Sequence, residues 1–247
     1  MQPLILGVRV QFLTSLGYPD QRFFFGGIMK KMKFAAVLVL CLLGSISVFG
    51  QQIKKKSGSL EDKVKQLSRN LLKKDSNQFR VPTPGQLKAW QFITESIMKN
   101  NVEDAGKMIR QLSFPYEIIL FTDKESKREY VLLEEEIPLQ AGWGMFVFDL
   151  NSKSSLVLQI PHPLFDGNTE FQGIDAFLQT GAKAFMLAGA HRRTNTEDTP
   201  CTQPKSSRSD ANYPVSDVAH AIATPFHAVH EALVRSHPTM VAVQLHG

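Results

Sequence analysis

All seven histidines of this chain lie between His162 and His246, in its C-terminal part. Three of them directly follow short apolar, β-rich segments: His162 follows 156–160, His191 follows 184–190, and His246 follows 240–245. Ligands and catalytic groups converge at the carboxyl ends of the strands in an open α/β sheet, so these positions predict one shared site. Imidazole is a common metal ligand, and the simplest interpretation is a metal site.

Two carboxylates follow the first of these histidines, in a segment that comes after a strand and before an expected helix. His162 lies between two prolines, and Asp166 and Glu170 come four and eight residues later. A catalytic zinc ion takes about three protein ligands and keeps one position for water. His162 with Asp166 or Glu170 supplies two ligands, and His246 is the natural third. The alternative is an Asx-type turn at 166–168, with the histidine placed there only for backbone reasons.

Two adjacent arginines follow the second histidine. Gly189 and neighbouring alanines precede His191 and permit close approach of another backbone or a ligand. An arginine can clamp a carboxylate with two parallel hydrogen bonds. The group predicted to bind a substrate carboxylate consists of His191, Arg192, Arg193 and Asn195. The alternative is a solvated basic turn.

A third polar group precedes the last expected helix. Asp217 and His220 lie in a loop, where they could act as acid–base groups or support the metal ligands. The long polar segment 192–216 is suited to a lid or a substrate wall. His230 shares a helix face with apolar residues and should point toward the sheet, as a core histidine does.

The order of strand, histidine with a nearby carboxylate, crossovers, and strand with histidine resembles the zinc-dependent carboxypeptidase and amidohydrolase superfamily. That superfamily includes N-formylglutamate amidohydrolase-like enzymes, and the cell-wall N-acetylmuramoyl-alanine amidases have a similar ligand order. The resemblance covers roughly residues 155–247. The compact His-x-x-Glu pair of the carboxypeptidases is absent, because His162 and Asp166 are four residues apart.

The resemblance implies a hydrolase that cleaves an amide bond near a carboxylate in a small molecule or peptide. Its zinc ligands would be His162, Asp166 or Glu170, and His246, and Arg192 or Arg193 with Asn195 would hold the substrate carboxylate. The general base of these families comes from a later strand, so a C-terminally truncated chain is expected, with Asp217 or Glu170 as possible substitutes. Two alternatives remain: a metal-dependent phosphoesterase that uses His220 and Arg193 on phosphate, and a non-catalytic periplasmic metal- or ligand-binding protein.

The elements that must position these residues form an α/β fold. Helices with apolar faces are expected within 51–113, the second of them starting at the Thr83-Pro84 signal. Strands are expected at 116–121, 129–134, 145–150 and 156–160, with successive strands as antiparallel neighbours. Helices at 171–180 and 224–234 then alternate with strands at 184–190 and 240–245, which predicts parallel pairing. The prediction is a mixed sheet covered by helices on both faces, comparable to phosphorylase- and hydrolase-type sheets.

The first 50 residues are predicted not to belong to the mature fold. Residues 1–28 resemble an upstream extension, and 29–50 have the basic, apolar and small-residue regions of a signal peptide. The mature protein would then contain a helical segment at 51–113, beginning with a polar linker at 51–58, and an α/β domain at 114–247. It would be periplasmic or secreted, with no stable membrane span after cleavage.

Charge and cysteine content argue against a general nucleic-acid-binding protein and against a fold stabilised by intrachain disulfides. The leader holds five of the 28 basic and one of the 23 acidic residues, so the remainder carries a net charge of only +1. That balance gives no general attraction to nucleic acid. Cys201 is the only cysteine after the leader, so no intrachain disulfide is expected. Nucleotide-binding glycine motifs are also absent from the sequence.

Overall fold

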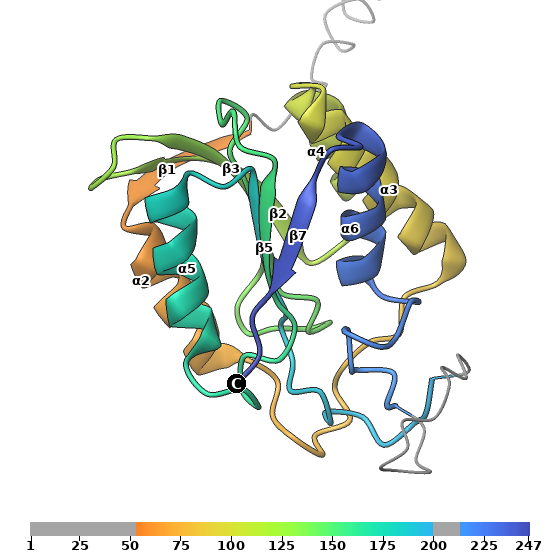
Figure 1. The fold of residues 1–247 in the computed structure, drawn as a ribbon. Helices are drawn as coiled ribbons and strands as arrows, with labels where there is room; N and C mark the ends of the chain where they lie inside the picture. Colours follow the sequence, from red (N-terminus) through yellow and green to blue (C-terminus); the bar gives the residue numbers. More distant parts are fainter. Residues whose placement is uncertain (1–52, 200–212) are drawn as a thin grey trace, which may run out of the picture. The chain divides into compact units, whose positions relative to one another are not determined.

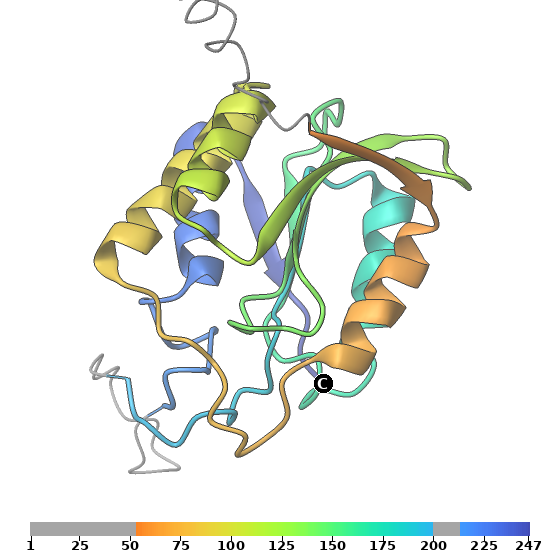
Figure 2. The same cartoon turned by 180° about the vertical axis from the view of Figure 1, so that it is seen from behind.

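A mixed β-sheet with helices on both faces forms the framework of the protein (Figures 1 and 2). The computed structural model describes residues 53–199 and 213–247. The predicted extension, the predicted signal peptide and Cys201 lie outside this range. The α/β class predicted from the sequence is confirmed.

The described residues contain seven strands and five helices. The strands are β1 (Lys54–Gly58), β2 (Tyr116–Asp123), β3 (Glu129–Glu135), β4 (Met145–Phe148), β5 (Leu156–Ile160), β6 (Ala184–Leu187) and β7 (Val241–Gln244). The helices are α2 (Leu60–Asn70), α3 (Pro84–Met98), α4 (Val102–Gln111), α5 (Thr169–Thr180) and α6 (Pro225–Ser236).

The strand order is β1-β2-β3-β4-β6-β5-β7. β2, β3, β4 and β6 are successive antiparallel neighbours, whereas β6, β5 and β7 run parallel to one another. The prediction of parallel pairing in the C-terminal half is confirmed. The expectation that β4 and β5 pair with each other was wrong, because β6 lies between them. All four residues of β6 are buried and apolar, which suits a central strand covered on both faces.

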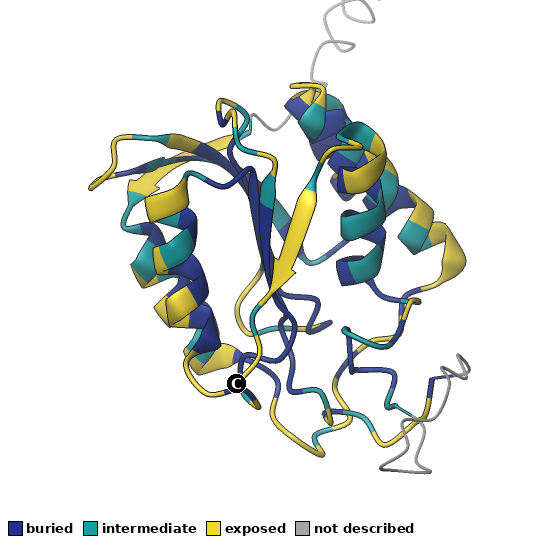
Figure 3. Cartoon of the chain, in the orientation of Figure 1, coloured by how far each residue is buried: buried dark blue, intermediate teal, exposed yellow. Residues whose placement is uncertain are grey.

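The helices form two layers, one on each face of the sheet (Figure 1). α2 and α5 pack on one face, and α3, α4 and α6 pack on the other. A buried aromatic cluster lies on the second face. The ring centroid of Trp90 in α3 is 4.8 Å from that of Tyr116 and 5.3 Å from that of Phe146. Burial is continuous along the central strands, whereas β7 at the sheet edge is exposed (Figure 3).

The N-terminal helical segment is an integral part of the sheet fold. Residues 54–58, predicted to be a linker, instead form β1, which pairs in parallel with β2. α3 begins where the sequence predicts, with a capping box in which the Thr83 side chain accepts from Gln86 N. Within the described residues, the N-terminal helices and the strands of the sheet belong to one compact unit.

A close backbone contact shapes the sheet edge at which the histidines lie. A Cβ atom at Gly189, just beyond β6, would lie 2.5 Å from the backbone nitrogen of Gly144. Only glycine permits this approach, as the sequence suggested. The turn that carries His191 is thereby fixed against the loop before β4. Among the described residues, no helix is long and apolar enough to span a membrane.

Candidate metal centre

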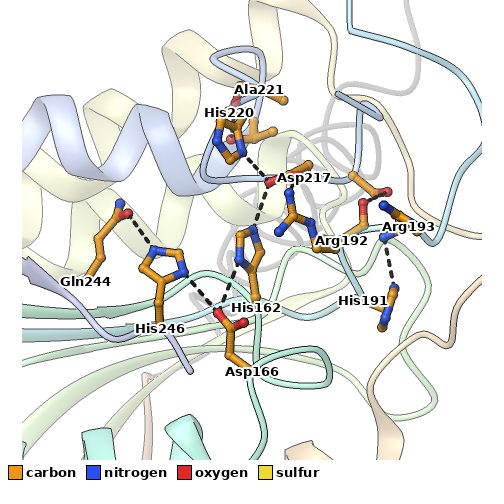
Figure 4. A network of polar contacts seen from close by, with 12 residues as sticks. His162, Asp166, His191, Arg192, Arg193, Asp217, His220, Ala221, Gln244 and His246 are labelled. Atoms are coloured by element: carbon orange, nitrogen blue, oxygen red, sulfur yellow. Dashed lines mark hydrogen bonds and ion pairs between the residues drawn. The ribbon is translucent and has the colours of Figure 1, made fainter. Parts of the chain in front are cut away.

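His162 is the central residue of the polar network at this edge (Figure 4). It follows β5 by two residues, and its side chain is only 1% exposed. Its two ring nitrogens face two different carboxylates: Nε2 lies 2.8 Å from Asp217 Oδ1, and Nδ1 lies 3.4 Å from Asp166 Oδ2. The ring is thus held between two acidic groups on opposite edges.

His246 reaches the same place from the neighbouring strand. It follows β7, which pairs in parallel with β5, and its ring centroid is 5.1 Å from that of His162. Its Nδ1 lies 3.0 Å from Asp166 Oδ2 (Figure 4). Parallel strands bring their carboxyl ends to one edge, which explains why two imidazoles 84 residues apart in sequence lie side by side.

The nitrogens of His162 and His246 and an oxygen of Asp166 have the arrangement of a metal-binding triad. These ligand atoms all lie within 4.8 Å of one another. In a tetrahedral site with bonds of about 2.1 Å, ligand atoms lie about 3.4 Å apart. The distances from Asp166 Oδ2 to the two histidine nitrogens, 3.4 and 3.0 Å, are close to that value.

An unsatisfied buried atom supports the same interpretation. His162 Nδ1 is fully buried and, within the described part of the chain, has no hydrogen-bond partner. Buried polar atoms are almost always paired, because an unpaired one costs on the order of 1–3 kcal/mol. A cation bound between His162, Asp166 and His246 would use the lone pair of this nitrogen. The residues present therefore fit a metal ion.

A second group, His162, Asp217 and His220, also brings ligand atoms within 4.8 Å of one another. Here a cation is already present: Arg192 Nη2 lies 2.6 Å from Asp217 Oδ2. The guanidinium balances the carboxylate and would repel a metal ion. Of the two groups, the one containing Asp166 and His246 is therefore the better candidate.

Asp217 carries a charge deep in the protein, where its side chain is fully buried. Burial alone would raise its pKa, but hydrogen bonds from His162 and His220 and the charge of Arg192 outweigh it and lower the pKa to about 2. The ionised carboxylate accepts a hydrogen bond from the Nε2–H of His162, which leaves the lone pair of that ring on Nδ1. Asp217 thus orients a candidate ligand from the side away from Asp166, in the way that carboxylates support metal-bound histidines.

His220, the other predicted acid–base group, lies beyond Asp217. Its Nδ1 is 2.9 Å from Asp217 Oδ1, and its ring stacks on Tyr213 at 3.7 Å between centroids. Both predicted acid–base residues are therefore brought next to His162. Asp217 and His220 lie on the Nε2 side of the His162 ring, whereas Asp166 faces its Nδ1.

Glu170, the alternative carboxylate ligand, belongs to neither metal-binding group of the described residues. Its side chain is buried in the first turn of α5, and Oε1 accepts a hydrogen bond from the Ser68 hydroxyl at 2.7 Å. The geometry thus favours Asp166 as the carboxylate ligand.

The predicted substrate-binding residues are distributed along a braced turn after β6. Asn195 uses both ends of its amide on the backbone of Phe79, at 3.1 and 2.9 Å. His191 Nδ1 accepts the backbone N–H of Arg193 at 2.9 Å, and burial lowers the pKa of His191. The guanidinium of Arg192 lies over the Phe165 ring, 4.9 Å from its centroid. Only Arg192 of this group contacts the metal-site network directly.

Comparisons with family models, curated proteins and solved structures found no match. The function must therefore be inferred from the chemistry of the site.

Sequence reasoning overlooked Phe165, Gln159 and Gln244 at this site. Phe165 is 51% exposed beside Arg192, and its only sequence signal is a large apolar residue in a polar loop. Gln159 is a polar residue inside the otherwise apolar strand β5, and Gln244 is the residue facing it on β7. A glutamine within an otherwise apolar strand was the feature of the sequence that could have indicated the role of Gln159.

Proposed function

We propose that this protein is an exported zinc-dependent hydrolase that cleaves an amide bond near a carboxylate. The observation that carries the proposal is the convergence of His162 Nδ1, His246 Nδ1 and Asp166 Oδ2. The first of these atoms is buried and has no hydrogen-bond partner among the residues that the structure describes. Export rests on the signal-like sequence at 29–50 alone.

Two imidazoles and one carboxylate are a ligand set typical of catalytic zinc, which keeps a further position for water or substrate. A structural zinc site would have four protein ligands instead. A zinc ion held by these residues would supply Lewis-acid polarisation of the scissile carbonyl and would acidify a water molecule.

The chain's own residues have separate tasks in this proposal. Asp217 accepts a hydrogen bond from the Nε2–H of His162 and so keeps Nδ1 free for the metal. Arg192 neutralises the buried charge of Asp217 and lies 20% exposed at the rim. Arginine uses only part of its five N–H donors on one carboxylate oxygen, so the others remain to bind a substrate carboxylate.

The neighbouring Phe165 defines the rest of the proposed substrate wall. Its ring is half exposed and lies 5.8 Å, between centroids, from the ring of His191. An apolar ring beside a guanidinium suits a substrate that carries an aliphatic or aromatic group next to its carboxylate. Acylated amino acids, peptides and peptidoglycan fragments meet this description.

The test combines metal analysis with substrate cleavage. The purified protein should bind one zinc ion per chain and hydrolyse N-acyl amino acids faster than the matching amides without a carboxylate. His246→Ala should lose both properties. The matched control is His227→Ala, because His227 lies on α6 and pairs with Glu231, outside the site.

Three results would contradict the proposal in different ways. Failure to bind zinc would refute the metal site. Stoichiometric zinc without turnover of any amide would indicate a metal-binding protein. Preferential cleavage of phosphate esters would indicate the phosphoesterase.

A further inference from the structure

A buried glutamine in the centre of the sheet is linked to the proposed metal site. Gln159 is 1% exposed and lies in β5, the strand that leads to His162. A buried amide must have its hydrogen bonds satisfied, or it destabilises the fold. Both ends of this one are satisfied by side chains of neighbouring elements.

The surroundings of Gln159 fix the direction of its amide. Its Nε2 lies 3.3 Å from the sulfur of Met186 and 2.9 Å from Nδ1 of His230 on α6. A thioether sulfur can only accept, so the amide group facing it must be the NH2. Burial lowers the pKa of His230, so its ring is neutral and has a lone pair to offer.

The orientation of Gln159 in turn sets that of Gln244. Because the NH2 of Gln159 faces His230, its oxygen faces β7 and accepts from Gln244 Nε2 at 3.0 Å. The amide of Gln244 therefore presents its own oxygen on the other side. That oxygen lies 3.4 Å from Nε2 of His246 (Figure 4).

The chain of contacts ends on a proposed ligand. The Gln244 oxygen that faces His246 Nε2 accepts a hydrogen bond from that nitrogen. Nδ1 of His246 faces Asp166, whose ionised carboxylate can only accept, so Nδ1 donates to it in the metal-free protein. A bound metal ion would replace the Nδ1 proton and leave the ring protonated on Nε2. This is the tautomer that Asp217 imposes on His162 from the opposite side of the site. Both candidate ligand histidines are thus held by a hydrogen-bond acceptor on Nε2.

We propose that Gln159 and Gln244 are positioning residues that orient His246 for metal binding through Nδ1, with His230 as their anchor. This inference rests on the proposed zinc site. It explains why a polar side chain lies in a buried strand and why His230 faces the sheet.

The experiment compares zinc affinity in variants whose side chains keep their length but lose the amide. Gln159→Met and Gln244→Met should each weaken zinc binding 10- to 100-fold, the range typical of residues that support a metal ligand. Because Gln159 acts on His246 only through Gln244, the double variant should bind zinc no more weakly than the single variant with the lower zinc affinity. Gln172→Met, on an exposed position of α5, is the matched control and should bind as the wild type does.

Two further measurements distinguish positioning from a structural role. Gln244→Glu keeps an oxygen toward His246 but loses the donor to Gln159, so it should weaken zinc binding clearly less than Gln244→Met does. Long-range 1H–15N NMR of the metal-free wild type should find His230 protonated on Nε2 and bare on Nδ1. Gln244 is exposed at the sheet edge, so its variants should fold even where Gln159→Met does not.

The outcomes separate this inference from the proposed function. If the wild type binds zinc and Gln244→Met binds it equally tightly, the inference is overturned and the zinc site stands. Equal weakening by Gln244→Met and Gln244→Glu, or a proton on Nδ1 of His230, would overturn the inference as well. A wild type that binds no zinc overturns the proposed function and with it this inference.

Discussion

Replacement of Asp217 by Asn tests the electrostatics of the site without changing its shape. The carboxylate is fully buried and contacts His162, His220 and Arg192 at 2.8, 2.9 and 2.6 Å. Asparagine keeps the volume and one acceptor oxygen but removes the charge that balances the guanidinium. The metal-free protein should therefore lose stability, because Arg192 remains only 20% exposed and without its counter-ion.

The pKa of Asp217 gives the magnitude. A pKa lowered from 3.8 to about 2 corresponds to folding free energy on the order of 2 kcal/mol, at ~1.36 kcal/mol per unit. Because the pKa is lower in the folded state, this contribution is fully present above the unfolded pKa of 3.8. It disappears as the pH falls through about 2. Asp217→Asn should thus destabilise the protein by about 2–3 kcal/mol at neutral pH and by much less at the acidic end.

Urea unfolding of the EDTA-treated wild type and variant, from pH 7 down to pH 2.5, measures this difference. The gap between the two unfolding free energies should narrow as the pH falls below 4. A difference that stays constant across that range would refute the role assigned to the ionised carboxylate. The variant should also bind zinc more weakly, since a neutral amide oxygen is a weaker acceptor for the Nε2–H of His162 than the carboxylate is.

Two further predictions concern the neighbourhood of the site. Asp166→Asn should abolish stoichiometric zinc binding. Glu170→Gln should leave one zinc ion per chain, because the Glu170 carboxylate accepts a hydrogen bond from Ser68 instead of facing the metal site. Metal analysis measures the zinc content of both variants, and an equal loss in the two would contradict the ligand assignment. Gly189→Ala should cost several kcal/mol, on the order of a severe overpacking mutation, because the new Cβ would lie 2.5 Å from a backbone nitrogen. Denaturant unfolding measures the latter, and a change below about 1 kcal/mol would mean that the two loops can move apart.

The sequence predicted those features that depend on local pattern. Thr83 marked the start of α3, and the apolar segments marked most strands, because capping and alternation act over a few residues. The convergence of His162 and His246 followed from parallel pairing, which places successive strand ends at one edge. The geometry also accords with an orientation of His230 toward the sheet, since a helical face can be read from spacing.

The features that sequence did not predict depend on contacts between distant residues. The place of β6 between β4 and β5 is set by burial on both faces, which no local pattern encodes. Arg192 and Asp217 flank a long polar segment whose sequence has no periodicity, so local pattern could not predict that they pair. For the same reason the choice between Asp166 and Glu170 stayed open until their surroundings were known.

The most direct test of the metal site is a crystal structure of the zinc-soaked protein with anomalous data collected on both sides of the zinc edge. One strong peak should lie about 2.0–2.2 Å from Nδ1 of His162, Nδ1 of His246 and a carboxylate oxygen of Asp166. A peak between His162, Asp217 and His220, or no peak at either group, would contradict the assignment.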